Sequence, residues 1–160
     1  LDLCSGNAFI PYYIYSKRAS EVVCVDKDHN AAKNALRLHR KPNIKYFYDD
    51  IFNFKWPENY FDVVVIRGAI EHFTQDQQHK IFKKAYGLLK PGGHFCGDTP
   101  AARDGEDKML SSHEYEWQDE SQMAKELSSV FEDIYTKTFI SKEPPDGKSL
   151  RKTLLWSCKK

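Results

Sequence analysis

Apolar residues along this chain fall into two kinds of segment. Some form short, nearly continuous runs, which are typical of strands buried on both faces of a sheet. In others the apolar residues recur every three or four positions, which indicates an amphipathic helix. The pattern predicts strands at residues 1–3, 21–26, 44–48, 61–66, 94–98, 131–140 and 150–158. It predicts helices at residues 9–18, 29–38, 75–89 and 120–130.

The order of these segments predicts an α/β fold. Strands and helices alternate through the first five strands, which favours a doubly wound, mostly parallel sheet with helices on both faces. No helix is evident between the third and fourth strands, so the chain is expected to cross there to the other half of the sheet. The last two strands are separated only by turn residues, Glu143–Gly147, and therefore form a C-terminal antiparallel hairpin.

Polar residues mark the helix starts and one long connection. Asp28 and Asp119 stand where a helix N-cap is expected, and Thr74 with Gln77 forms a capping-box pattern. Residues 99–118 are polar and longer than an ordinary connection, which is typical of a functional loop. This loop carries His113, Tyr115 and Trp117, which either bind a substrate or pack on the fold.

Composition narrows the picture. The 160 residues are enough for one domain, residues 1–160, and because residue 1 lies inside a strand we expect an N-terminal segment to be missing. The formal net charge of +1 argues against a nucleic-acid partner, and no apolar run is long enough for a membrane span. No signal peptide is visible, and the four cysteines are scattered singly, which favours the reducing cytoplasm. The six histidines have no metal-ligand spacing, so no metal site is expected.

A candidate ligand site begins at the N-terminus. Residues 1–9 are expected to form a strand end, a tight turn around Gly6 and a helix start, which together are either a ligand site or an ordinary connection. Asp26 ends the second strand, 20 residues after Gly6, where a carboxylate can accept hydrogen bonds from both ribose hydroxyls. Asp50 ends the third strand, where it can accept from an adenine amine while Ile51 packs on the ring; a solvated turn is nearly as good an explanation.

Residues after the fourth strand are also candidates for ligand binding and proton transfer. Arg67 and Gly68 lie at the carboxyl edge of the sheet, where ligands bind. Glu71 and His72 follow at once, and a histidine beside a carboxylate can take a proton. A pair of helix-start residues satisfied by local hydrogen bonds is an equally good explanation.

The order and spacing of these motifs resemble the class I S-adenosylmethionine-dependent methyltransferases over almost the whole chain. That resemblance implies a seven-stranded sheet, parallel except for a last strand inserted by a hairpin. It also implies a cofactor site for S-adenosylmethionine. The residues that it assigns to this site are Asp2, Cys4, Gly6, Asn7, Asp26, Lys27, Asp50, Ile51, Arg67 and Gly68. The chain departs from the family pattern at Cys4 and Ala8, where glycines are usual, and at Lys27, whose aliphatic stem would have to cover the adenine.

The resemblance implies transfer of a methyl group to an oxygen or nitrogen atom of a small-molecule acceptor. The loop at residues 99–118 is the candidate acceptor site, and His72, beside Glu71, is the candidate base. One alternative is a nicotinamide-dinucleotide-binding oxidoreductase domain, although the turn at Gly6 lacks two of the three glycines of that fingerprint. Another alternative is a nucleotide-binding remnant without turnover. The oligomeric state does not follow from the sequence.

Overall fold

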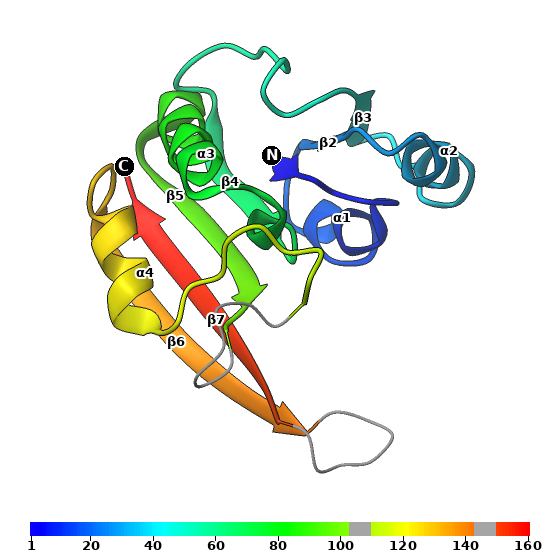
Figure 1. The fold of residues 1–160 in the computed structure, drawn as a ribbon. Helices are drawn as coiled ribbons and strands as arrows, with labels where there is room; N and C mark the ends of the chain where they lie inside the picture. Colours follow the sequence, from blue (N-terminus) through cyan, green and yellow to red (C-terminus); the bar gives the residue numbers. More distant parts are fainter. Residues whose placement is uncertain (103–109, 143–149) are drawn as a thin grey trace.

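The computed structural model describes residues 1–102, 110–142 and 150–160, and it contains one seven-stranded sheet (Figure 1). The strand order is β3-β2-β1-β4-β5-β7-β6. Strands β1 to β5 pair in parallel, and β7 pairs antiparallel with both β5 and β6. The strands are β1 (Asp2–Leu3), β2 (Val22–Asp26), β3 (Ile44–Tyr48), β4 (Phe61–Arg67), β5 (Leu89–Pro100), β6 (Glu132–Lys142) and β7 (Leu150–Lys159). This topology confirms the predicted doubly wound sheet, the crossover after β3 and the inserted last strand.

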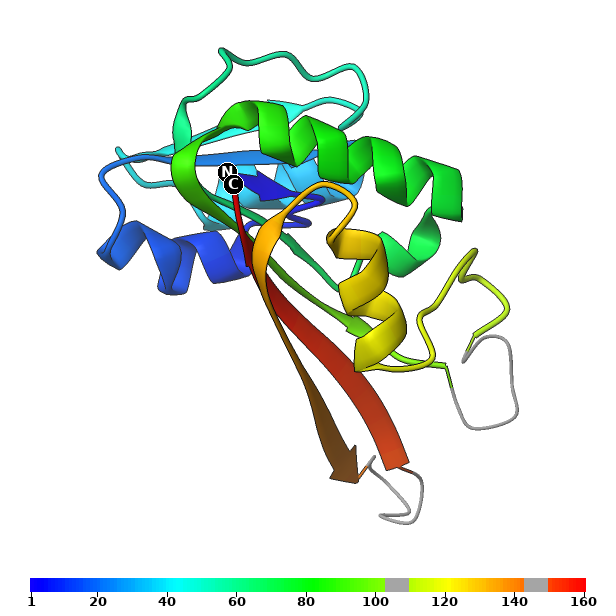
Figure 2. The same ribbon diagram turned by 90° about the vertical axis from the view of Figure 1, so that its left-hand side faces the viewer.

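Helices cover both faces of the sheet (Figure 2). The four α-helices are α1 (Phe9–Tyr13), α2 (His29–Leu38), α3 (Gln75–Leu88) and α4 (Glu120–Leu127), and the 3-10 helices are η1 (Tyr15–Lys17) and η2 (Ile70–His72). Helices α1 and α2 lie on one face, and α3 and α4 lie on the other. Their starts follow the predicted chemistry: Asp28 and Asp119 accept hydrogen bonds from backbone amides of α2 and α4, and Thr74 with Gln77 forms a complete capping box.

The two faces carry separate cores. On the α3 and α4 side, Val23 and Val25 of β2 belong to a large cluster with Phe82 of α3 and Leu127 of α4. On the other side, Val22 and Cys24 belong to a small cluster with Ala8 and Ala35. Successive β2 residues thus point to opposite faces, and burying both faces explains the unbroken apolar run from Val22 to Val25.

Three sequence-based expectations were wrong, two about element boundaries and one about burial. The predicted helix 9–18 is interrupted at Ile14, and Tyr13 and Ile14 are exposed. Strand β5 begins at Leu89 instead of residue 94. Residues 89–93 follow α3 directly and already belong to the strand, where the sequence predicted a break between helix and strand. Val63 in β4 is exposed, so this strand is not buried on both faces. The predicted turn Glu143–Gly147 lies outside the described residues.

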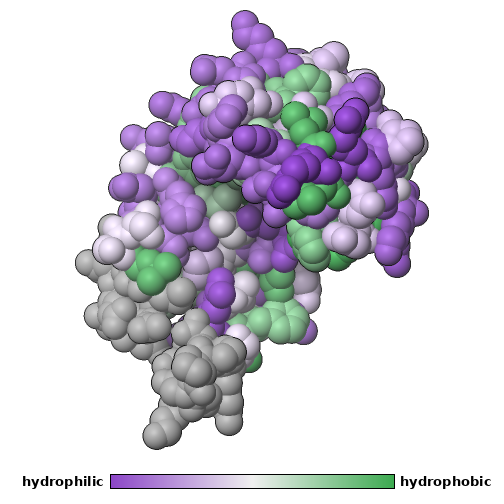
Figure 3. Space-filling model, turned by 90° about the vertical axis from the view of Figure 1, so that its right-hand side faces the viewer, coloured by the Kyte–Doolittle hydropathy of each residue, from purple (hydrophilic) through white to green (hydrophobic). Residues whose placement is uncertain are grey.

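The surface is mixed in character. The face seen in Figure 3 is mainly hydrophilic, with small apolar patches scattered over it. Helix α2 contributes two exposed leucines, Leu36 and Leu38. Among the described residues, no helix combines the length and apolar character that crossing a membrane requires.

Candidate functional site

The turn after β1 is held in place from two neighbouring strands. The backbone amide of Gly6 donates a hydrogen bond to Asp26 Oδ2 at the end of β2, with 2.7 Å between nitrogen and oxygen. The hydroxyl of Tyr46, in β3, donates to the carbonyl oxygen of Gly6. Asp26 Oδ1 accepts a second hydrogen bond, at 2.8 Å, from the amide of Asp28. The predicted pair of Gly6 and Asp26 is therefore one structural unit at the carboxyl edge of the sheet.

Three residues of this turn adopt left-handed backbone conformations. Their φ angles are 57° at Cys4, 56° at Gly6 and 59° at Ala8. Glycine adopts this conformation without steric cost, whereas a side chain makes it unfavourable. Cys4 and Ala8 are the two positions where the sequence departs from a glycine-rich pattern. The turn thus has the shape expected of three glycines, although two of them are replaced.

A cavity of about 260 Å³ lies beside this turn. Its lining residues come from the ends of β1, β2, β3 and β4, and they are Cys4, Asp26, Lys27, Asp28, Asp50, Ile51, Ala69, His72 and Phe73. Six of these residues were predicted as site residues from the sequence. The lining combines carboxylates with the apolar side chains Ile51 and Phe73, both of which are almost fully buried. Such a lining suits a ligand that has a polar sugar and a flat apolar ring.

The carboxylate of Asp50 faces Lys27 across the cavity. Lys27 Nζ lies 3.8 Å from Asp50 Oδ2, and Asp50 Oδ1 accepts a hydrogen bond from the amide of Phe52 at 2.8 Å. The lysine side chain is mostly exposed, so the ion pair contributes little to stability. One oxygen of Asp50 is thus fixed by the backbone, and the other is held only by a mobile cation that a ligand amine can replace.

Other predicted residues lie near the cavity without lining it. Arg67 forms a bidentate contact with Asp98 of β5, with 2.6 Å between Nε and Oδ1, and the amide of Gly68 donates to the Asp98 carbonyl. Asn7 is exposed, and its carbonyl oxygen contacts the His39 ring. Burial raises the pKa of Asp2 from 3.8 to about 7, against the opposing influence of nearby positive charges. A cation bound beside Asp2 would therefore strongly favour its ionised form.

Glu71 and His72 are brought together with a residue of the following loop. Glu71 is buried, and its Oε2 accepts a hydrogen bond from Thr99 Oγ1 at 2.8 Å. His72 is exposed at the cavity edge, with its Nδ1 3.3 Å from the carbonyl oxygen of Ser112. The His113 ring lies edge-on to the His72 ring, with 5.0 Å between centroids. This cluster was only partly foreseen, since His113 is 41 residues beyond His72 in the sequence (113 − 72).

In the described part of the loop at residues 99–118, the aromatic residues Tyr115 and Trp117 contact the rest of the fold to different extents. Trp117 is buried against Phe82 and Trp156, so it packs on the fold. Tyr115 is partly buried and its hydroxyl donates to Glu126 of α4 at 2.7 Å. These two side chains support the packing explanation of the loop, and acceptor binding by residues 99–118 stays a prediction.

Three lining residues were not among the predicted site residues: Asp28, Ala69 and Phe73. Asp28 was assigned only to capping α2, and its role in the cavity wall follows from the bend at the end of β2. Phe73 is apolar and follows Glu71 and His72, so only its position after η2 could have pointed to the cavity.

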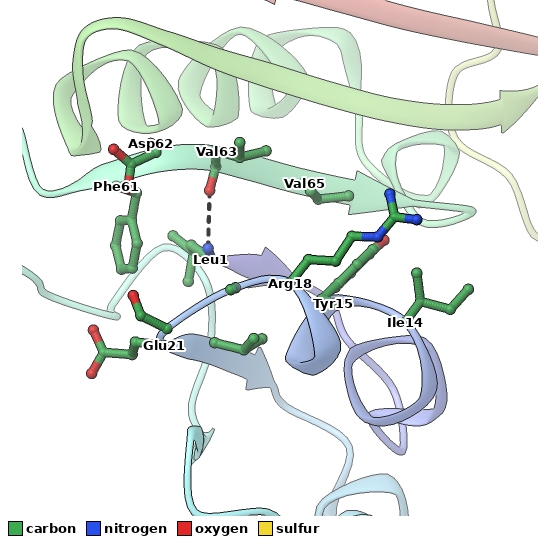
Figure 4. Close-up of a pocket in the computed structure, with 12 residues that line it drawn as sticks. Leu1, Ile14, Tyr15, Arg18, Glu21, Phe61, Asp62, Val63 and Val65 are labelled. Carbon is green, nitrogen blue, oxygen red and sulfur yellow. Dashed lines mark hydrogen bonds between the residues drawn. The ribbon is translucent and has the colours of Figure 1, made fainter.

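A larger cavity of about 550 Å³ lies elsewhere, between η1 and β4 (Figure 4). Its wall includes Ile14, Tyr15, Val63 and Val65, and the amino group of Leu1 donates to the Val63 carbonyl at its base. The cavity opens beside the amino end of β1, whereas ligands of open α/β sheets bind at the carboxyl ends of the strands. We therefore assign the functional site to the smaller cavity.

The comparisons of sequence both identify methyltransferases. A family profile described as a methyltransferase domain matches residues 1–93. Phosphoethanolamine N-methyltransferase from Plasmodium falciparum (isolate 3D7) is 33% identical over 94 residues, which make up 58% of this chain and 35% of that protein. The chain thus spans about a third of the length of this curated relative.

Solved structures share the fold over 99% of the chain. Phosphoethanolamine N-methyltransferase 2 from Haemonchus contortus, in complex with phosphomonomethylethanolamine and S-adenosylhomocysteine, has a TM-score of 0.80 at 17% identity, with 48% of its chain covered. An S-adenosylmethionine-dependent methyltransferase from Mesorhizobium loti has a TM-score of 0.70 at 16% identity, with 89% of its chain covered. At these identities the likeness concerns the fold, and it confirms the predicted architecture.

Proposed function

The chain belongs to the methyltransferase domain family, and from this we propose that it binds S-adenosylmethionine and transfers the methyl group to a small-molecule acceptor. The observation that carries the proposal is the unit formed by Gly6 and Asp26 at the wall of the smaller cavity. Each oxygen of Asp26 accepts one hydrogen bond from a backbone amide and retains capacity for another. The carboxylate can therefore accept from both hydroxyls of a ribose without leaving the turn.

The remaining lining fits the other parts of an adenosine ligand. Ile51 and Phe73 offer apolar surface to a flat ring, and Asp50 offers an oxygen to its exocyclic amine. Asp2 is a buried carboxyl near the turn, suited to the positively charged amino-acid end. Asp2, Cys4, Gly6, Asn7, Lys27, Arg67 and Gly68 are proposed to complete the cofactor site, as the sequence resemblance implies.

S-adenosylmethionine supplies a methyl group already activated on a sulfonium, so the protein mainly has to position the acceptor and exclude water. Positioning of this kind can lower a barrier by about 7–11 kcal/mol. His72 lies at the cavity edge, where an acceptor would have to approach, and Glu71 is buried next to it in the chain. That His72 takes a proton from the acceptor stays a prediction. The similarity to phosphoethanolamine N-methyltransferases supports a small acceptor. The methylated atom is proposed to be oxygen or nitrogen.

Calorimetric titration tests the proposal directly. The purified chain should bind S-adenosylmethionine and S-adenosylhomocysteine with one-to-one stoichiometry, and it should not bind a nicotinamide dinucleotide measurably. Preferential binding of the dinucleotide would favour an oxidoreductase, and failure to bind either would reject both. Turnover is then measured with methyl-labelled cofactor and a panel of small amines, phosphate esters and hydroxyl compounds. Tight cofactor binding without any turnover would favour a binding remnant.

A further inference from the structure

One cluster of side chains extends from the edge of the cofactor cavity into the protein interior. A carboxylate oxygen of Glu71 and one ring nitrogen each of His72 and His113 all lie within 4.8 Å of one another. Glu71 and His113 are buried, and His72 is exposed and lines the cofactor cavity. The cluster thus connects the protein interior with the place where the acceptor must approach.

Each of the three side chains has one polar atom engaged by a neighbouring residue, and the other polar atom of the same group is available as a possible metal ligand. The Nδ1 atom of His113 contacts Glu116 Oε1, which leaves Nε2 as the outer ring nitrogen. The Nδ1 atom of His72 faces the Ser112 carbonyl, which again leaves Nε2. Oε2 of Glu71 accepts from Thr99, which leaves Oε1. Metal-binding histidines are oriented in this way, with the second nitrogen hydrogen-bonded to a carboxylate or a carbonyl.

The charge of the cluster also favours a cation. Glu71 is a carboxylate with 4% of its surface exposed. Burying an ionised carboxylate is unfavourable unless charge or hydrogen bonds compensate it. Among the residues that the structure describes, no lysine or arginine forms an ion pair with Glu71. A divalent ion would offset this charge at the point where two imidazoles can bind it.

We propose that Glu71, His72 and His113 bind a divalent transition-metal ion beside the cofactor cavity, and that its open positions hold an oxygen atom of the methyl acceptor. Two histidines and one carboxylate suit Zn²⁺, Mn²⁺ or Fe²⁺, and they leave coordination positions open. Bonds of about 2.1 Å to a tetrahedral ion place ligand atoms about 3.3 Å apart, so the side chains need to draw together by about 1.5 Å at most. Rotation of the exposed His72 can shorten its distances to Glu71 and His113, and the distance between Glu71 and His113 has to shorten by a shift of these two buried side chains.

This inference rests on the proposed function for the nature of the acceptor, and it narrows the acceptor to one with an oxygen donor. It also departs from the sequence-based expectation that no metal site forms. A His72 side chain bound to metal has no free nitrogen to act as a base. The two roles proposed for His72 therefore exclude each other, and metal binding decides between them.

The test is calorimetric titration of chelator-treated protein with Zn²⁺ and with Mn²⁺, together with the visible spectrum after Co²⁺ addition. Wild-type protein should bind one ion, and His72→Ala, Glu71→Gln and His113→Ala should each weaken binding about 100-fold or more. His94→Ala removes an exposed histidine from the middle of β5 and should leave binding unchanged. His72→Ala is the decisive variant, because His72 is exposed and its loss should not disturb folding. Circular dichroism checks the two buried positions.

Glu116 serves as a positioning residue in this proposal. Glu116→Gln should weaken metal binding by about 10- to 100-fold, because it changes the partner of the His113 ring without removing a ligand. No stoichiometric metal binding, or equal binding by wild type and His72→Ala, would overturn the proposal. S-adenosylmethionine affinity is measured on the same samples, so loss of cofactor binding with intact metal binding would reject the proposed function alone.

Discussion

The carboxylate of Asp26 accepts a hydrogen bond from the backbone amide of Gly6, although 20 residues separate the two in sequence. The bond ties the end of β2 to the turn after β1. A residue assigned to ligand binding therefore also shapes the backbone that would bind the other half of the ligand. Substitution of Asp26 should affect both functions, and the variants have to separate them.

Asp26→Ala should weaken S-adenosylmethionine binding about 100-fold or more, because hydrogen bonds to a charged acceptor contribute about 1.5–3 kcal/mol each. Calorimetry provides the measurement. Asp62→Ala is the matched control, since Asp62 is an exposed carboxylate on β4 that pairs with Lys90. Asp26→Asn keeps one oxygen acceptor for the turn, so it should retain more of the wild-type stability than Asp26→Ala. Unchanged affinity in Asp26→Ala would remove the basis of the proposed site.

The free energy of unfolding should change with pH in part because of the carboxyl group of Asp2. Its pKa is raised by burial from 3.8 to about 7, so the folded protein binds this proton more tightly than the unfolded chain. The contribution to stability is fully present below about pH 4, and it is lost as the pH rises to about 7. Each unit of pKa difference corresponds to about 1.4 kcal/mol.

Asp2→Asn should remove this contribution. Urea unfolding at pH 5 and at pH 8 should show a smaller loss of stability for the variant than for the wild type over this interval. The comparison between the two pH values corrects for any constant effect of the amide. Equal pH dependence in the two proteins would mean that Asp2 is ionised in the folded state.

Two glycines should respond in opposite ways to alanine. At Gly97 in β5, an added Cβ would lie 2.2 Å from the Ile66 carbonyl oxygen and 2.2 Å from the Trp156 ring. Gly97→Ala should therefore destabilise the fold by about 3 kcal/mol or prevent folding. At Gly87 in α3, no atom lies within 4 Å of the added Cβ, so Gly87→Ala should stabilise the protein by about 1 kcal/mol. Thermal unfolding measures both, and a loss of stability in Gly87→Ala would contradict the described helix.

The hydroxyl group of Thr99 should contribute to the stability of the folded protein through its hydrogen bond to Glu71. Thr99→Val keeps the shape of the side chain but removes the donor to the buried Glu71 carboxylate, which should cost about 1–3 kcal/mol in metal-free protein. Thr153→Val, on the neighbouring strand β7, makes the same chemical change at a half-buried position and should cost much less. A similar loss in both variants would indicate that the Glu71 bond contributes nothing specific.

The fold could be predicted almost completely from the sequence, because each of its signals is local. Buried strands such as residues 22–26 are visible as apolar runs, and the capping box at Thr74 and Gln77 marks the start of α3. The error at Ile14 has a physical origin: helical spacing was present, but the short segment after the turn buries only Pro11 and has no apolar face to pack. Helix length therefore depended on tertiary contacts that the spacing did not show.

The candidate site was predictable where its residues follow strand ends. Asp26 and Asp50 could be found because parallel strands finish at the same edge of the sheet. His113 could not be paired with Glu71 and His72, because the path of the loop after β5 brings them together and no fixed spacing encodes that path. The left-handed backbone at Cys4 and Ala8 was equally hidden, since neither residue type signals it.

Strand β7 lies between β5 and β6, although it follows β6 in the chain. During synthesis on the ribosome, β6 therefore emerges before the only strand that can join it to the sheet. Until β7 docks, the growing chain presents the open edge of β5 together with Phe95, which packs against Trp156 of β7 in the folded protein. The nascent protein should accordingly depend on chaperone protection until its last strand has been made.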